Sequence, residues 1–401
     1  MANTNLSKAK NAKQDEFYTQ YADIEKEVTA YLEYNPDTFR DKVVLLPCDD
    51  PEWSNFTRYF ALHFEDLGLR KLISTSYAPD SKMLKEPLQL TLFETGSPQF
   101  DPSKAQTKGK IFVLDRDVDG NGRIDIDDLQ WHYLEGDGDF RSAEVKAFRD
   151  EADIIVTNPP FSLFREFFAW VMESGKKFLM IGNQNTITNK EVFLPIKHNR
   201  VWLGATGYAN DMVFRVPKWF EVKEADKQKA ARLGYVGNYT RLGNSCWFTN
   251  IEHGRRHQPL PLMTVADNLK FSKHKELKGK SNYEHYDNFN AIDVPYVDAI
   301  PSDYLEAMGV PITFLDKYCP EQFEILGLSQ IDCHEQLPDT KRYNEYKEML
   351  TATDKPTGSS GGKTNENAVL PGKGTKKTYY LGPNGEMVHS EYKRIFIRKK
   401  Q

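Results

Sequence analysis

The feature that most constrains the fold is the alternation of short apolar runs with helical patterns along the first half of the chain. The apolar run from Val43 to Leu46 is followed by a turn, a phenylalanine-rich helical segment and a second apolar run, KLISTSY. This strand–helix–strand unit predicts parallel strands, because only a long crossover can join them. GKIFVLD, DIIVTN and KKFLMIGNQ are expected to add strands, with FSLFREFFAWVMESG as a helix between the last two. The sequence therefore predicts an α/β fold with an open, doubly wound sheet, which binds ligands beyond the carboxyl ends of its strands.

The second half of the chain is less regular. From about Gly204 onward, short apolar runs lie between polar, aromatic and glycine-rich segments, which predicts a second, more β-rich lobe. Asn384-Gly385 is a hairpin signal between two strand-like runs. The predicted division is a first domain 1–205 with an acidic insertion 115–130, a middle region 206–300, and a C-terminal region 301–401 in which the Gly-, Ser-, Thr- and Lys-rich residues 352–377 form a flexible insertion.

Length and composition narrow the class of protein. The chain has 401 residues, of which 39% are hydrophobic, enough for one large core or two moderate ones. No window approaches the run of about 18 apolar residues that a membrane helix needs, and MANTNLSKAKNAK lacks the apolar core of a secretory signal. The 4 cysteines stand far apart without CxxC spacing, which disfavours zinc and a disulfide framework. We expect a soluble, cytoplasmic protein with reduced thiols and no membrane partner.

Charge is distributed unevenly around a formal net charge of −5. The segment from Asp115 to Asp139 holds 9 acidic residues against 2 arginines. Glu252 to Lys280 carries 7 lysines and arginines against 3 acids, and the last ten residues, YKRIFIRKKQ, carry 5 basic residues and no acid. The basic clusters are suited to phosphate contacts, although solvated helix faces and a terminal tail are an equal alternative.

The segment DIIVTNPPF ends an apolar strand with an asparagine and two prolines. Each proline ring fixes its own φ, and Pro160 biases Pro159 toward an extended backbone, so the loop is rigid. It can hold the Asn158 side-chain oxygen and the Pro159 carbonyl as two acceptors, with the Phe161 ring one step further on. Two acceptors and a ring match an exocyclic amino group on a flat heterocycle, and a base in a duplex must be flipped out to meet them. A purely structural turn is the alternative.

This segment resembles the catalytic motif of amino-group DNA methyltransferases, and the chain is similar to the EcoRI-type adenine-specific DNA methyltransferase family in particular. The resemblance spans nearly the whole chain. It implies a Rossmann-like catalytic sheet, S-adenosylmethionine as methyl donor, and catalytic roles for Asn158, Pro159, Pro160 and Phe161. The segments that carry it are KQDEFYTQYADIE, CDDPEWSNFTRYFA, GDGDFRS, DIIVTNPPFSLFRE, ITNKEVF, VWLG and MGVPITFLDKYCPEQFE.

The resemblance also implies where the donor binds. The usual glycine-rich turn after the first strand is absent, and PCDDPEWSN stands in its place. Asp50 or Asp49 is expected to receive the donor's ammonium group; the alternative is that these aspartates cap a helix beginning near Pro51. For Tyr18, the alternative to cofactor binding is a role as an aromatic side chain packed in the core. The full set assigned to the donor is Phe17, Tyr18 and Thr19 at its methionine end, Asp49, Asp50 and Pro51 at the turn, and Asp137, Asp139 and Phe140 at its adenine.

One segment departs from the family pattern. DVDGNGRIDIDD, residues 117–128, has the spacing of a calcium-binding loop, with Gly122 at the sixth position. Its last ligand position holds aspartate where an EF-hand has glutamate, and a strand replaces the incoming helix. A structural Ca²⁺ and a metal-free acidic loop both remain open. The expected ligands are Asp117, Asp119, Asn121, Arg123 through its carbonyl, Asp125 and Asp128.

The function predicted from the resemblance is methyl transfer from S-adenosylmethionine to N6 of a flipped-out adenine in a short site of double-stranded DNA. Rivals are a methyltransferase acting on RNA adenine or protein glutamine, and a non-catalytic DNA-binding or calcium-binding module. A monomer and a cognate restriction endonuclease acting on the same site are expected. The middle region 206–300 would read the DNA site, since arginine and asparagine suit guanine and adenine edges. Its candidate readers are Asn210, Arg215, Arg241, Asn244, Arg255 and Arg256.

Overall fold

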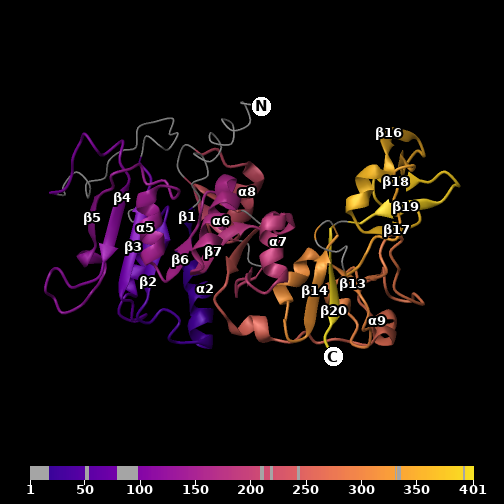
Figure 1. Ribbon diagram of the computed structural model, residues 1–401, viewed down its shortest axis with the longest axis horizontal. Helices are drawn as coiled ribbons and strands as arrows, with labels where there is room; N and C mark the ends of the chain where they lie inside the picture. The colour runs from indigo at the N-terminus through magenta and orange to yellow at the C-terminus, as the bar shows by residue number, and fades with distance from the viewer. Residues whose placement is uncertain are drawn as a thin grey trace. The chain divides into compact units, whose positions relative to one another are not determined.

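The computed structural model forms two compact units (Figure 1). Unit 1 comprises residues 1–186 and 201–254, and unit 2 comprises residues 187–200 and 255–401. The division differs from the boundary expected at residue 205, because the chain returns to unit 1 to complete its main sheet. The structure describes residues 18–49, 54–78, 98–207, 212–216, 220–241, 244–329, 331, 336–391 and 393–401.

The main sheet of unit 1 has eight strands in the order β5-β4-β3-β2-β6-β7-β11-β8. The four central strands, β3, β2, β6 and β7, are parallel, as the sequence predicts. The outer strands pair antiparallel, so the sheet is mixed and the parallel prediction holds only for its centre. The strands are β2 (Val43–Pro47), β3 (Lys71–Ser76), β4 (Lys110–Leu114), β5 (Gln130–Tyr133), β6 (Ile154–Thr157), β7 (Lys177–Asn183), β8 (Trp202–Leu203) and β11 (Ser245–Thr249).

Helices cover both faces of this sheet, because successive strand residues point to opposite sides. Leu179 of β7 and Trp247 of β11 join a core with buried side chains of α2 (Tyr21–Tyr34) and α3 (Asn55–Leu62). Their neighbours face the other way: Phe178 contacts Phe168, and Phe248 contacts Phe164, both on α6 (Phe164–Ser174). Helix α5 (Ala143–Glu151) packs against β2, and the 3₁₀ turns η2 (Ile126–Asp128), η3 (Phe161–Leu163) and η4 (Gln184–Thr188) lie in connections.

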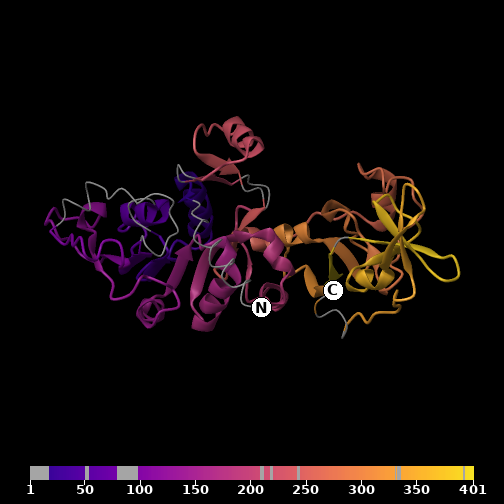
Figure 2. The ribbon, with the colours of Figure 1, turned by 90° about the horizontal axis from the view of Figure 1, so that it is seen from above.

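Unit 1 also contains a small antiparallel sheet of order β1-β9-β10. β1 (Tyr18–Thr19) and β10 (Tyr239–Arg241) both pair with β9 (Val213–Arg215), and α8 (Glu224–Arg232) lies between β9 and β10 in the chain. In Figure 2 the helical segment between β9 and β10 stands out from the rest of unit 1. Tyr18 and Thr19 therefore share one sheet with residues 213–215 of the expected recognition region.

Unit 2 contains two further sheets. A four-stranded sheet has the order β12-β13-β20-β14, and an antiparallel five-stranded sheet has the order β16-β15-β18-β19-β17. Residues 352–377 form β16, η8 and β17 instead of the flexible insertion expected from their composition, because their backbone pairs with neighbouring strands. The bounds are α7 (Lys190–Lys197), η5 (Gly254–His257), α9 (Val265–Phe271), β12 (Ile292–Asp293), η6 (Val297–Ala299), β13 (Met308–Pro311), η7 (Ile312–Lys317), β14 (Phe323–Leu328), β15 (Lys347–Leu350), β16 (Pro356–Ser360), η8 (Gly361–Glu366), β17 (Val369–Pro371), β18 (Thr378–Leu381), β19 (Met387–Ser390) and β20 (Arg394–Lys399).

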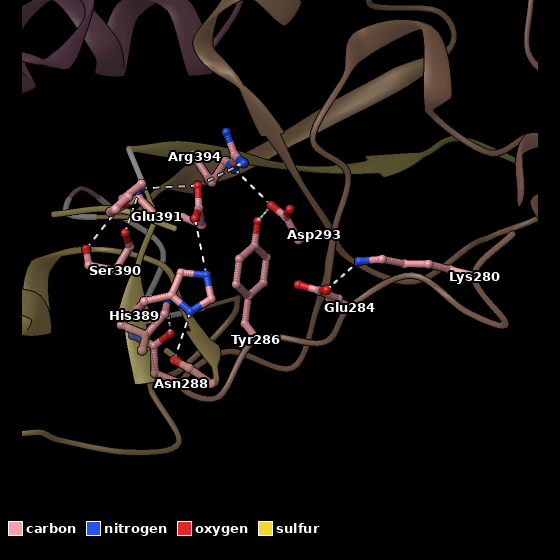
Figure 3. A network of polar contacts seen from close by, with 12 residues as sticks. Lys280, Glu284, Tyr286, Asn288, Asp293, His389, Ser390, Glu391 and Arg394 are labelled. Carbon is pink, nitrogen blue, oxygen red and sulfur yellow. Dashed lines mark hydrogen bonds and ion pairs between the residues drawn. The ribbon is translucent and has the colours of Figure 1, made fainter. Parts of the chain in front are cut away.

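A chain of polar contacts joins the two sheets of unit 2 (Figure 3). Arg394 of β20 pairs with Asp293 of β12 at 3.0 Å, and Asp293 also accepts a hydrogen bond from the Tyr286 hydroxyl at 2.5 Å. On its other side Arg394 approaches Glu391, which pairs with His389 of β19 at 3.5 Å.

Among the described helices, none combines the length and apolar composition needed to cross a bilayer.

Candidate active site

The carboxyl ends of β2, β3 and β6 meet at one edge of the main sheet. Pro47, the last residue of β2, pairs in register with Thr75 of β3, and Leu45 pairs with Ile155 of β6. The residues that follow these strands are therefore neighbours in space, as expected at the ligand-binding edge of a parallel sheet. This edge brings together the turn after β2, Tyr77 after β3 and the NPPF loop after β6.

The NPPF loop joins β6 to η3. Asn158 is half-buried, and its Nδ2 donates to Thr19 Oγ1 at 3.3 Å. In this orientation of the amide, its carbonyl oxygen lies on the side away from Thr19. Pro159 is buried, Pro160 is the N-cap of η3, and the ring of Phe161 is half-buried. The structure thus holds the predicted acceptor side chain and ring in one short, proline-fixed loop.

Two partners of this loop were not identified from the sequence. Thr19 is buried, accepts the hydrogen bond from Asn158, and offers its carbonyl to Asn55 Nδ2 at 2.7 Å. Phe214 of β9 is fully buried, and its ring centroid lies 6.4 Å from that of Phe161 at an interplanar angle of 85°. The pairing of β1 with β9 places Thr19 opposite Phe214. The only sequence signal for Phe214 was its place in the apolar run DMVFRVP.

The turn after β2 is stabilised by hydrogen bonds that centre on Asp49. Asp49 is 6% exposed; its N–H donates to the Thr75 carbonyl at 2.9 Å. Its carboxylate accepts from the hydroxyls of Ser54 and Thr157, each at 2.8 Å. Ser54 is the N-cap of α3, so the helix begins at Asn55 and not near Pro51 as the capping alternative supposed. Asp49 accepts a hydrogen bond from the N-cap residue Ser54 but is not itself the N-cap.

The remaining donor-site predictions divide between described and undescribed residues. Phe17, Asp50 and Pro51 lie outside the described residues, as does the predicted DNA reader Asn210. Tyr18 is half-buried in β1, opposite Arg215 of β9, so both its predicted cofactor role and its core alternative stay open.

The GDGD segment lies against the end of β3. The Asp137 carbonyl accepts from Ala78 N at 2.8 Å, and a Cβ at Gly138, whose φ is +82°, would lie 2.3 Å from the Ser76 carbonyl oxygen. Only glycine permits this close approach. Asp139 pairs with Arg141 at 2.6 Å; burial raises the pKa of Asp139, but the hydrogen bonds from Arg141 outweigh it and leave the pKa below its ordinary value.

Phe140 has a packing role that the sequence did not indicate. Its ring is 1% exposed and lies edge-on to Phe167 and Trp170, at centroid distances of 5.1 and 5.7 Å. The Arg141 guanidinium lies over the ring at 5.4 Å. The adenine-stacking role predicted for Phe140 therefore stays a prediction, while its place in the core explains the residue type.

The acidic loop folds around three of the predicted ligands. Carboxylate oxygens of Asp117, Asp119 and Asp128 lie within 4.8 Å of one another. Asp128 accepts from the backbone N–H groups of Val118, Asp125 and Asp119, and these hydrogen bonds lower its pKa.

The other predicted ligands of this loop have local roles. Asn121 Oδ1 accepts from Arg123 N at 2.8 Å, and Asp125 accepts from Asp127 N at 2.9 Å as the N-cap of η2. The loop is anchored to the turn that follows α3, where Ile124 N donates to Glu65 Oε1 at 2.9 Å. It therefore flanks the sheet on the side of α3.

The predicted DNA readers fall in both units. Arg215 is exposed on β9, Arg241 is half-buried on β10, and Asn244 is exposed just before β11, all in unit 1. In unit 2, Arg255 pairs with Asp316 at 2.6 Å. Arg256, also in unit 2, is 7% exposed and donates to Asn199 Oδ1 at 3.0 Å. Internal contacts thus account for the last two arginines, whereas Arg215 and Asn244 are exposed.

The composition of this edge fits an S-adenosylmethionine donor. Gly138 brings Asp137 and Asp139 beside the end of β3, where their oxygens suit an amino-group donor such as adenine N6. The Asp49 turn lies at the end of the adjacent strand. The donor carries an ammonium group at its other end, and the turn after β2 is acidic, although the Asp49 carboxylate itself is occupied by the Ser54 and Thr157 hydroxyls.

Comparisons with known proteins show the family of the chain. The family model of "Adenine-specific methyltransferase EcoRI" matches residues 5–400. The type II methyltransferase M.EcoRI of Escherichia coli is 41% identical over 322 residues, which cover 80% of this chain and 88% of that protein. M.MpnI of Mycoplasma pneumoniae is 33% identical over 329 residues, covering 82% and 85% of the two chains. M.MgeORF184P of Mycoplasma genitalium is 31% identical over 329 residues, covering 82% and 86%.

No solved structure matches the chain significantly. The family model nevertheless spans almost every residue, and the aligned regions cover most of the length of each relative. The family predicted from the NPPF loop and its flanking segments is confirmed, and the chain belongs to the EcoRI-type adenine-specific methyltransferases.

Proposed function

We propose that this protein is a site-specific DNA methyltransferase that transfers a methyl group from S-adenosylmethionine to N6 of a flipped-out adenine in a short duplex site. The position of Asn158 carries the proposal. It directly follows a central parallel strand, its amide nitrogen contacts Thr19 Oγ1, and Phe161 lies three residues further along the same loop. Membership of an adenine-specific family and relatives named type II methyltransferases support adenine in DNA as the substrate.

The chain's own residues act on the amino group of the target adenine. The Asn158 side-chain oxygen and the Pro159 carbonyl accept its two hydrogens, which orients the N6 lone pair toward the methyl group. Stacking on Phe161 returns about 1–3 kcal/mol of the unstacking free energy. Catalysis then comes from positioning, because no covalent enzyme intermediate is needed for direct in-line attack.

The donor, when bound, supplies a methyl group on a sulfonium, so an uncharged amine suffices as nucleophile. We assign its adenine amino group to Asp137 or Asp139. Both Asp49 oxygens already accept hydroxyl hydrogen bonds, which makes Asp50 the better candidate for its ammonium group. Tyr18 and Thr19 are proposed for its methionine end.

For the DNA itself we propose the surface around β9 and β10 in unit 1. Arg215 and Arg241 lie on these two strands, and β9 pairs with β1, whose Thr19 contacts Asn158. A side chain that reads a base there would be connected through one sheet to the catalytic loop. We further propose that the enzyme acts as a monomer beside a cognate restriction endonuclease of the same site specificity, since its relatives are named type II methyltransferases.

For the acidic loop we propose a structural calcium ion. The 12-residue spacing carries this proposal, and the carboxylates of Asp117, Asp119 and Asp128 are near enough to share one ion. Its role would be to stabilise the connection between β4 and β5. No catalytic metal is proposed.

The test uses tritiated S-adenosylmethionine with duplex DNA, RNA and a protein extract, followed by digestion of the DNA and identification of the labelled nucleoside. We expect label in N6-methyladenine, and its loss in Asn158→Ala. Asn183→Ala is the matched control, because Asn183 ends the adjacent strand β7 and is also half-buried. Label confined to RNA or protein would overturn the substrate, and no label anywhere would favour a binding module.

A further inference from the structure

Strand β6 is joined to β2 in two different ways along its length. Backbone pairing with β2 covers Val44 with Ile154 and Leu45 with Ile155. At the end of β6 the contact with the β2 segment is made by the side chain of Thr157. Its hydroxyl lies 2.6 Å from the Pro47 carbonyl and 2.8 Å from Asp49 Oδ2. Thr157 is fully buried and directly precedes Asn158. A side-chain link thus spans the two strands where the catalytic loop begins.

The Asp49 end of this link is fixed on three sides. Its second carboxylate oxygen accepts from Ser54, which caps α3 by accepting from Phe56 N at 3.1 Å. Its N–H donates to the Thr75 carbonyl at 2.9 Å. Its carbonyl accepts from the Ser74 hydroxyl. Two hydroxyls contact the buried carboxylate and two further hydrogen bonds hold its backbone, so Asp49 acts as a rigid reference point for Thr157.

We propose that Thr157 is a positioning residue, which uses the buried Asp49 carboxylate to hold the catalytic loop in register with the donor-binding turn. The inference rests on the proposed function. The turn after β2 locates the methyl group and the loop after β6 locates the amino group, so the hydrogen bond between them sets the distance over which the methyl group moves. Misplacement of reacting groups by about 1 Å can slow a reaction about 100-fold.

The alternative is that Thr157 is simply a buried threonine whose hydroxyl needs a partner. Thr249 is the matched control for that role. It is also fully buried in the same sheet, on β11, and its hydroxyl donates to the Phe178 carbonyl at 2.7 Å. Thr249→Val and Thr157→Val each remove one buried hydroxyl at nearly constant volume. Only the second change breaks a link between the two ligand-binding segments.

The experiment measures four quantities on the full-length enzyme: the single-turnover rate of DNA methylation, the affinity for S-adenosylmethionine, the affinity for duplex DNA, and amide hydrogen exchange of residues 157–163. We expect Thr157→Val to slow the single-turnover step by about tenfold or more. Both affinities should stay within about threefold of wild type, and exchange in the loop should accelerate. Thr157→Ser retains the hydroxyl and should recover most of the rate.

Equal rates for Thr157→Val and Thr249→Val would overturn the proposal, as would a loss of donor affinity as large as the loss of rate. If Thr157→Val fails to fold, Thr157→Cys replaces it: a thiol is only a weak hydrogen-bond donor, so the same loss of rate with retained affinity is expected. Absence of DNA methylation by the wild-type enzyme would refute the proposed function instead. The exchange measurement would then still decide whether Thr157 orders the loop.

Discussion

Replacing Glu27 by glutamine tests how the segment leading to β9 is held. Glu27 lies on α2, is fully buried, and accepts hydrogen bonds at both carboxylate oxygens. Oε1 accepts from Ala205 N at 2.7 Å and the Tyr31 hydroxyl at 2.9 Å. Oε2 accepts from the N–H of Thr206 at 2.8 Å and from its hydroxyl at 2.6 Å. Gly204 permits this approach, because a Cβ there would lie 2.2 Å from Oε1.

The magnitude follows from counting donors. A glutamine keeps one oxygen, so its NH₂ group must face one of the two backbone N–H groups. A buried donor left without an acceptor costs about 1–3 kcal/mol, and the bonds to the remaining oxygen weaken because they are no longer charge-assisted. Burial raises the pKa of Glu27 against these hydrogen bonds, so removing the charge returns part of the loss. We expect a net local destabilisation of about 2–4 kcal/mol.

Amide exchange reads this change directly at residues 204–207. A loss of 2–4 kcal/mol corresponds to acceleration of about 30- to 900-fold for amides that exchange through local opening. Glu33→Gln, exposed on the same helix, is the control and should leave exchange unchanged. Methylation should also fall in Glu27→Gln, since the segment leads to Phe214 beside Phe161. Acceleration of less than about threefold would refute the role given to this carboxylate.

Three further perturbations test other parts of the chain. Burial raises the pKa of Asp23 from 3.8 to about 6. The stabilising contribution of its protonated form is therefore complete below the unfolded pKa and is lost as pH rises through about 6. Asp23→Asn should remove this dependence, so that the free energy of unfolding measured with urea changes less between about pH 4 and pH 6. Calcium at 100 times its dissociation constant should stabilise the protein by about 2.7 kcal/mol, visible as a higher Tm and absent in Asp119→Asn; neither heat nor a Tm shift would refute the site. Arg394→Met leaves buried Asp293 without its partner and should destabilise unit 2 by about 3–5 kcal/mol, whereas adding Asp293→Asn should recover much of that loss.

Much of the fold near the site was readable from local sequence. The apolar runs of β2, β6 and β7, and the helix beginning just after Phe161, follow from periodicity and proline placement. Pairing direction did not follow, because an apolar run such as KIFVL has the same pattern in parallel and antiparallel sheets. β4 therefore gave no sign that it would pair antiparallel with β3. The composition of 352–377 also misled, since backbone pairing can order a segment that has little apolar content.

The candidate site shows the same limit more sharply. Asn158 and Phe161 were identified because their chemistry is visible in the residue types. Thr19 and Thr157 act through hydroxyls whose partners are 139 and 108 residues away in the chain. A threonine at the end of a strand is ordinary in any sequence, so only the three-dimensional structure reveals which hydroxyls reach the loop.

The turn after β2 keeps its shape in this chain without a glycine-rich loop. Cys48 adopts φ +72°, a left-handed conformation that costs a non-glycine residue about 1–2 kcal/mol. The hydrogen bonds of Asp49 to Thr75, Ser54 and Thr157 offset that cost and fix the turn. A glycine-rich turn would bring its backbone to a ligand without any such side-chain anchor. Because the same carboxylate also contacts Thr157, which directly precedes the NPPF loop, we expect a substitution in either segment to affect the other.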